Sequence, residues 1–164
     1  MGAIKIMELV GQVDLNATPE AVWAALFDPA VLQGCFPGCK SVERKSETEY
    51  AAVLQVKVGP LNAGFNGLIS LTDPEYLSAV TLAGTLNGAG AGFAKGTARI
   101  VLAPRNLVTE LSYKADLRLG GKLAAVGDRL FGTAVKRNIA DFLAAFAAIV
   151  DERKEGAAPC AASL

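Results

Sequence analysis

Two cysteines lie close together in the segment CFPGC, residues 35–39. A structural zinc site needs four Cys or His ligands in two closely spaced pairs, but the chain has no histidine and its third cysteine, Cys160, is distant. Thiol–disulfide enzymes place two residues, not three, between their cysteines, and a reducing cytosol disfavours a simple disulfide. We therefore predict no metal site and interpret CFPGC as a turn, in which Pro37 fixes φ and Gly38 takes a positive φ.

The absence of histidine also removes the commonest general base and any Ser–His or Cys–His pair. The acids of the last predicted strand, Glu110 and Asp116, alternate onto its polar face together with Lys114 and Arg118, where charge pairing explains them. No acid pair falls on an apolar face, so we predict no catalytic residue. A cyclase-type enzyme is the less favoured alternative.

The glycine-rich segment LNGAGAGFAKG, residues 86–96, invites comparison with a phosphate-binding loop. Neither G-x-G-x-x-G nor G-x-x-x-x-G-K-[ST] fits it. We predict a β-hairpin whose glycines adopt backbone angles that other residues avoid.

Composition places the chain among globular proteins, with 52% hydrophobic and 20% charged residues. Sixteen basic and sixteen acidic residues cancel, so no excess charge favours nucleic acid. The N-terminal segment MGAIKIMELVG has no apolar core of a secretory signal, and no apolar run approaches the roughly 20 residues of a membrane span. We expect a cytoplasmic protein.

Local patterns predict one α+β domain over residues 1–155. The segment 7–15 alternates as a strand, and Thr18-Pro19 and Asp28-Pro29 carry the start signals of two short helices. From Lys40 to Leu119, apolar residues recur at every second position, which predicts about six more antiparallel strands, with Asp73-Pro74 as one of the turns.

After Gly120-Gly121 the apolar period changes to three and four residues. This change predicts one C-terminal helix of about eight turns, long enough to cover the sheet. The expected fold is a curved antiparallel sheet of about seven strands around that helix. We expect residues 156–164 to form a tail without regular structure.

Undersized side chains recur on the predicted inner face of the sheet, among them Ala52, Gly67, Gly96, Ala98 and Ala115. Because protein interiors are close-packed, either the helix lies very near these positions or an apolar guest fills the space. Both alternatives stay open. The role of two inward tyrosines, Tyr50 and Tyr113, also stays open, because each hydroxyl could form a hydrogen bond within the protein or to a ligand. The predicted lining of a ligand cavity is Phe36, Pro37, Tyr50, Leu54, Phe65, Ile69, Ala98, Tyr113, Leu117, Leu123, Val126, Leu130 and Phe131.

Several motifs in one order resemble the carbon monoxide dehydrogenase G-subunit family, which belongs to the START-like, SRPBCC helix-grip superfamily. They are ATPEAVWAALFDPAVLQGCFPGCKSVE, KVGPLNAGFNG, AGFAKGTA and GGKLAAVGDRLFGTAVKRNIADF, and the resemblance spans roughly residues 7–150. It implies an accessory protein of a molybdenum-containing carbon monoxide dehydrogenase, linked to the cytoplasmic membrane and binding a quinone or another lipid. It carries over no catalytic residue and no covalently bound cofactor. An adaptor with a filled core and no ligand is the alternative.

Basic residues gather at the approach to the long helix. Between residues 118 and 140 five basic residues face a single acid, Asp128. A solvated helix face explains such a bias, but basic groups also gain about 1 kcal/mol each beside an anionic leaflet. We predict Lys122 and Arg129 as contacts with the inner face of the cytoplasmic membrane.

Overall fold

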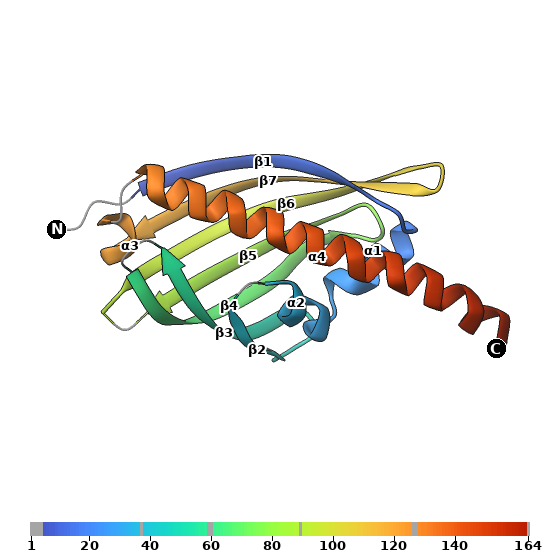
Figure 1. Ribbon diagram of the computed structural model, residues 1–164, viewed down its shortest axis with the longest axis horizontal. Helices are drawn as coiled ribbons and strands as arrows, with labels where there is room; N and C mark the ends of the chain where they lie inside the picture. Colours follow the sequence, from blue (N-terminus) through green and yellow to red (C-terminus); the bar gives the residue numbers. More distant parts are fainter. Residues whose placement is uncertain (1–4, 37, 59–60, 89, 126–127, 164) are drawn as a thin grey trace.

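The computed structural model describes residues 5–36, 38–58, 61–88, 90–125 and 128–163, with side chains described except at residues 5, 58, 128–131 and 152–163. One curved sheet and a long helix across its concave face make up the fold (Figure 1). The elements in chain order are β1 (Lys5–Leu15), α1 (Pro19–Leu26), α2 (Pro29–Cys35), β2 (Cys39–Arg44), β3 (Glu49–Val58), β4 (Leu61–Glu75), β5 (Ala79–Gly88), β6 (Gly92–Arg105), β7 (Val108–Gly120), α3 (Lys122–Ala125) and α4 (Asp128–Ser163).

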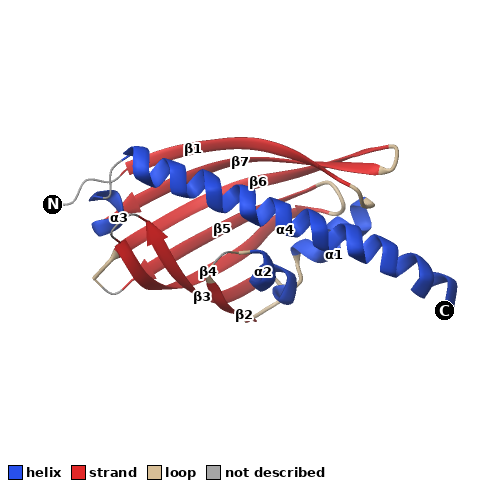
Figure 2. Cartoon of the chain, in the orientation of Figure 1, coloured by secondary structure: helices blue, strands red, loops and turns tan. Residues whose placement is uncertain are grey.

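The sheet has seven strands in the order β1-β7-β6-β5-β4-β3-β2, and every neighbouring pair is antiparallel. Its two edge strands, β1 and β2, are consecutive strands in the chain. Helices α1 and α2 therefore carry the chain from one edge of the sheet to the other, at the end where β1 finishes (Figure 2). The predicted sheet, the two short helices and the C-terminal helix are confirmed.

The two short helices begin where the sequence predicts. The Thr18 hydroxyl accepts a hydrogen bond from the Ala21 amide at 3.2 Å, and the Asp28 carboxylate accepts one from the Ala30 amide at 2.9 Å. A proline follows each cap and needs no partner for a backbone N–H, which it lacks. These caps fix where each helix starts and hence how α1 and α2 approach α4.

The predicted turn at Asp73-Pro74 is wrong. Asp73 has φ 48° but lies within β4, where the pairing with β5 shifts register between Thr72 and Glu75. The chain reverses after Glu75, with Leu77 at φ 65°, and β5 covers Ala79–Gly88. An aspartate tolerates the left-handed conformation, so the residues that signal a turn here form a bulge in a longer strand.

The element predicted as one C-terminal helix is two described helices, α3 and α4. The backbone of α4 continues to Ser163, whereas we expected no regular structure at 156–164. The side chains of that segment lie outside the described residues, and the domain boundary at residue 155 stays a prediction.

The buried apolar residues form two separate clusters under α4. The first, at the α1 and α2 end, includes Leu15, Val22, Tyr50, Leu71 and Phe146. The second cluster, at the α3 end, includes Phe65, Ala94, Leu119 and Leu123. The core therefore has two packed ends, which places the centre of the concave face between them.

Candidate functional site

A band of small residues crosses the middle of the concave face. Its members face one another across strand pairs as Ala98–Ala115, Gly84–Gly96 and Ala52–Gly67, and we call them the small-residue belt. The three alanines of the belt belong to neither apolar cluster. The belt thus separates the two packed ends of the core.

The central strand is not fully covered where the belt crosses it. Leu82, Gly84 and Leu86 of β5 face α4 but are only half-buried. Among the described residues, a Cβ on Gly84 would meet only the Leu68 carbonyl oxygen, at 3.6 Å, and no side chain within 4 Å. The close approaches of α4 are mainly to α1, α2, β1 and β3, not to the central strands. We refer to the half-buried part of this surface beneath α4, which is residues 82–86 with Gly96, Ala98 and Ala115, as the central hollow.

The predicted lining residues are divided between the two clusters. Tyr50, Ile69 and Tyr113 pack in the cluster at the α1 end, and Phe65, Leu117 and Leu123 pack in the cluster at the α3 end. Ala98 lies in the belt between them and is half-buried, whereas Leu54 is buried. Pro37 and Val126 lie outside the described residues, as do the side chains of Leu130 and Phe131. The lining as a set therefore stays a prediction.

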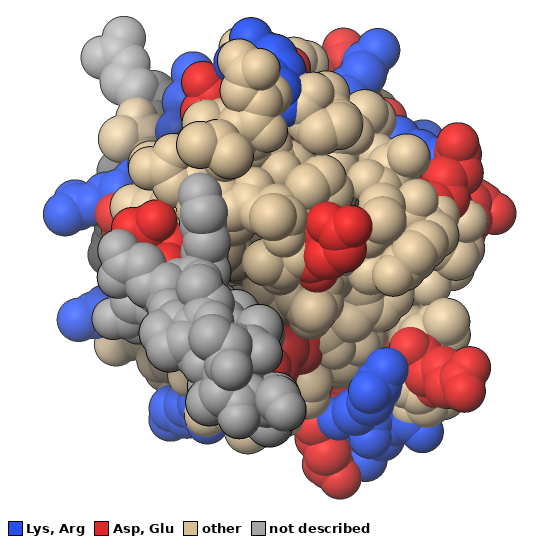
Figure 3. Space-filling view, turned by 90° about the vertical axis from the view of Figure 1, so that its right-hand side faces the viewer, with Lys and Arg blue, Asp and Glu red and all other residues tan. Residues whose placement is uncertain are grey.

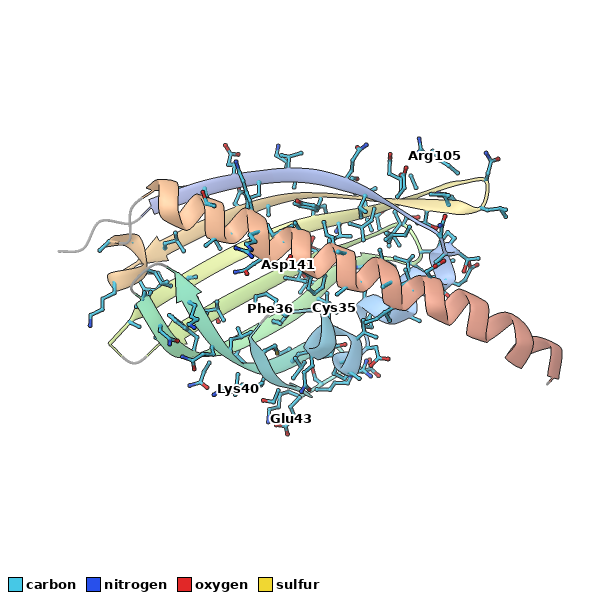
Figure 4. All side chains as sticks on the ribbon, in the orientation of Figure 1. Cys35, Phe36, Lys40, Glu43, Arg105 and Asp141 are labelled. Atoms are coloured by element: carbon cyan, nitrogen blue, oxygen red, sulfur yellow. The ribbon has the colours of Figure 1, made fainter. Side chains whose placement is uncertain are left out.

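Phe36 lies at the end of α2, on the side facing α4 (Figure 4). Its ring makes an edge contact with Phe142 of α4, 6.5 Å between centroids, and 36% of its surface remains exposed. This places Phe36 at the rim of the space under α4.

Tyr50 is fully buried and bonded within the fold. Its hydroxyl donates a 2.7 Å hydrogen bond to the carbonyl oxygen of Phe27, which joins β3 to the end of α1. Burial raises the pKa of the Tyr50 hydroxyl above its usual value of 10.0, while the nearby Arg44 cation opposes that shift. The O–H of Tyr50 therefore donates its hydrogen bond within the protein, where it stabilises the fold.

Replacing Tyr50 by phenylalanine should cost about 1 kcal/mol at neutral pH, because the Phe27 carbonyl loses its partner. In the wild type the raised pKa means that the folded state holds the proton more tightly than the unfolded state. This contribution is present below pH 10.0 and is lost as pH rises through the folded-state pKa. Urea unfolding across this alkaline range should show a steeper decline in the wild type than in Tyr50→Phe, and parallel declines would contradict the assignment.

Tyr113 supplies the matched control, because its hydroxyl has no hydrogen-bond partner among the described residues. The ring lies over Gly11, its register partner on β1, and the hydroxyl oxygen occupies the place where a Cβ of Gly11 would be. Tyr113→Phe should therefore change the free energy of unfolding by much less than Tyr50→Phe. Tyr113 is half-buried, and a hydrogen bond from its hydroxyl to a ligand stays a prediction.

The CFPGC segment is a turn between α2 and β2, as predicted. Cys35 ends α2, Gly38 has φ 81°, and Cys39 begins β2. A Cβ on Gly38 would overlap the carbonyl oxygen of Gln55, so this position requires glycine. Both thiols are free, and burial raises their pKa values, which keeps them protonated at neutral pH.

The glycine-rich segment is the β5–β6 hairpin, also as predicted, with Gly90 and Gly92 at positive φ. Gly92 packs directly against the backbone of Gly120 and of α3. The ring of Phe65 fills the place of a side chain at Gly88. The glycines thus allow the hairpin, α3 and the second cluster to meet closely.

The structure describes the side chain of only one of the two predicted membrane contacts. Lys122 is exposed at the start of α3, whereas the side chain of Arg129 lies outside the described residues. Lys95 and Arg118 face each other directly on the outer surface of β6 and β7, and both are exposed. In the part of the chain that the structure describes, no helix combines the length and apolarity needed to cross a bilayer.

Sequence reasoning missed a pocket of about 820 Å³ at the α1 end of the molecule. It is lined by Trp23, Phe27, Arg44, Lys45, Ser46, Glu47, Thr48, Pro74 and Tyr76. None of the predicted lining residues belongs to it. The spacing of Trp23 and Phe27, four residues apart on α1, was the available signal, but their other neighbours come from distant turns. Gly84 and Leu86 were also missed, because only the pairing of β5 with β4 and β6 places them beside the small residues of those strands.

A family model described as the carbon monoxide dehydrogenase G subunit (CoxG) matches residues 11–150. The chain belongs to the CoxG family. A crystal structure of a conserved protein from Geobacillus kaustophilus is similar to this CoxG family chain, with 31% identity and a TM-score of 0.83 over 90% of this chain and 97% of that chain. None of the curated proteins searched matches it.

Two more distant structures support the START-like fold of this CoxG family member. A START superfamily protein from Mycobacterium smegmatis has 14% identity and a TM-score of 0.61 over 88% of this chain and 97% of that chain. The Zhui aromatase/cyclase from Streptomyces sp. R1128 has 16% identity and a TM-score of 0.67 over 91% and 96%. At these identities the likeness concerns the fold alone, and the helix-grip expectation is confirmed.

Proposed function

We propose that this chain is a non-catalytic accessory protein that holds an apolar small molecule in the central hollow and serves a carbon monoxide dehydrogenase. One observation carries the proposal: Ala52 and Gly67 of the small-residue belt are buried, but the rest of the belt is only half-buried under α4, namely Gly84, Gly96, Ala98 and Ala115. An exposed apolar interior is costly in water, so a guest that buries it would be stabilised by about 25 cal/mol per Å² of apolar area. Membership of the CoxG family supports the link to the dehydrogenase.

A quinone or another lipid is the ligand class that we propose for the hollow. Gly84 has no side chain over it among the described residues, whereas Leu117 lies over Gly96, with its Cδ1 3.1 Å from the place of a Cβ. Leu82, Leu86 and Leu117 therefore form an apolar surface around Gly84. Such a surface selects by shape and apolar area rather than by charge. The Tyr113 hydroxyl could donate a hydrogen bond to a carbonyl oxygen at the edge of the sheet.

Extraction of the purified protein with organic solvent, followed by mass spectrometry, tests the proposal. An apolar compound should be recovered at close to one molecule per chain, and added quinones should raise the melting temperature. Recovery of no apolar compound, together with no thermal shift for any quinone tried, would overturn it.

Ala98→Phe should block the hollow, because it places a ring in the belt beside Ala115. We expect quinone affinity to fall by more than about tenfold, or 1.4 kcal/mol, as measured by titration calorimetry. Thr97→Phe is the matched control, since Thr97 is exposed on the outer face of the same strand. Equal affinities for the two variants would place the ligand elsewhere.

A peripheral contact with an anionic membrane is the second part of the proposal. It rests on Lys122 and on the directly opposed Lys95 and Arg118, because like charges facing each other across strands are costly unless an anionic surface neutralises them. Flotation with phosphatidylserine vesicles tests this contact. Ala98→Phe should still float and should still bind the dehydrogenase if docking and ligand binding are separate roles.

A further inference from the structure

The pocket at the α1 end has an aromatic wall that comes from two distant segments. The ring centroids of Trp23 and Phe27 of α1 lie 5.1 Å apart, and Tyr76 of the β4–β5 turn meets Trp23 edge to face at 5.8 Å. Tyr76 is 73% exposed, an unusual position for so large an apolar surface. Figure 3 shows this end of the molecule: uncharged residues make up much of the face, an acidic side chain stands near its centre, and the other charged residues lie toward its margin.

The opposite wall is the β2–β3 turn, which holds the Arg44 guanidinium in place. Its Nε–H donates to the Ser46 carbonyl oxygen at 3.2 Å, and Nη2 donates to the Glu47 carbonyl oxygen at 3.3 Å. The group also lies over the Tyr50 ring, 5.8 Å from Cζ to the centroid. These two hydrogen bonds and the ring contact hold the guanidinium in place. A guanidinium has five N–H donors, and the others are unused among the described residues.

The ion pairs of the described residues give Arg44 no carboxylate at salt-bridge distance, although Asp28 acts on the same Tyr50 hydroxyl as Arg44. Lys45, by contrast, pairs with Glu43 at 3.3 Å. The two cations of the lining outnumber its single acid, Glu47. A pre-ordered guanidinium with free donors suits a planar carboxylate, which it can bind with two parallel hydrogen bonds.

We propose that this pocket is a second binding site, selective for small aromatic carboxylates. The ring of the ligand packs on Trp23 and Tyr76, and its carboxylate binds Arg44. The volume of about 820 Å³ is within the roughly 300–1,000 Å³ typical of small-molecule sites. The pocket shares no residue with the central hollow.

The experiment is a titration with 2-naphthoate, observed by NMR through the indole N–H of Trp23, the single tryptophan of the chain. We expect a saturable shift of that signal. The neutral probe 2-naphthylmethanol has the same ring system and should bind about tenfold more weakly, because it lacks the charge-assisted hydrogen bonds. Arg44→Gln should lower naphthoate affinity by a similar factor and leave naphthylmethanol affinity unchanged.

Two further variants separate the site from general effects. Tyr76→Ala should weaken both probes and, because Tyr76 is exposed, should leave the fold intact. Arg105→Gln makes the same substitution on the β6–β7 hairpin, where Arg105 pairs with Asp14 at 3.1 Å, and should change neither affinity. No saturable shift of Trp23, equal affinities for the two probes, or an unchanged affinity in Arg44→Gln would each overturn the proposal.

Discussion

Replacing Phe146 by alanine should lower the free energy of unfolding by about 3–5 kcal/mol. The side chain is fully buried in the cluster at the α1 end and stacks on Phe142, with 6.0 Å between ring centroids. Truncation removes the apolar burial and leaves a cavity that the surrounding helices and strands can fill only in part. Denaturant unfolding followed by circular dichroism measures the loss.

Phe36→Ala is the control for this prediction. Phe36 also contacts Phe142, but 36% of its surface is exposed, so we expect a loss of about 1 kcal/mol. A loss as large as that of Phe146→Ala would mean that the rim of the hollow, rather than the buried cluster, attaches α4 to the sheet. The two losses in the free energy of unfolding therefore show whether the buried cluster or the rim contributes more to attaching α4 to the sheet.

Replacing Gly92 by alanine should cost about 3 kcal/mol or more. Gly92 has φ 102°, and this conformation alone costs a residue with a side chain roughly 1–2 kcal/mol. A Cβ would also overlap the Gly120 carbonyl oxygen and crowd the amide nitrogens of Lys122 and Leu123, at 3.0 and 3.1 Å. Backbone atoms cannot rotate away as a side chain can. The β5–β6 hairpin and α3 would therefore separate, which denaturant unfolding should detect.

Gly90→Ala, two residues away in the same hairpin, separates the cost of the positive φ from the cost of the overlap with backbone atoms. Gly90 has φ 73°, but no atom of the part of the chain that the structure describes lies within 4 Å of its Cβ position. It bears only the conformational cost, about 1 kcal/mol. Equal losses for the two variants would show that the contact between Gly92 and Gly120 does not hold the α3 end together.

The local elements were predictable because their signals lie within a few residues. Thr18-Pro19 and Asp28-Pro29 fix helix starts through their own side chains, and strand alternation follows from the strand's own geometry. The same local logic assigned CFPGC to a turn, because positive φ at Gly38 is a property of that residue. It failed at Asp73, where pairing with β5 decided between a turn and a bulge.

The candidate site was predictable only in part. Alternation placed Ala52, Gly67, Gly96, Ala98 and Ala115 on the inner face, but strand register made them adjacent, and register also added Gly84. The two inward tyrosines have the same pattern in the sequence. Tyr50 alone reaches the Phe27 carbonyl, because α1 ends above β3, whereas Tyr113 lies over Gly11.

The amino-acid sequence by itself determined the fold class, the family and the apolar character of the concave face, since periodicity and motifs are written along the chain. Only the tertiary structure decided that the core packs at two ends and that Trp23, Arg44 and Tyr76 surround one pocket. These arrangements depend on strand pairing and on how two short helices cross the end of a sheet. Contacts between residues far apart in the chain leave no local pattern from which they could be predicted.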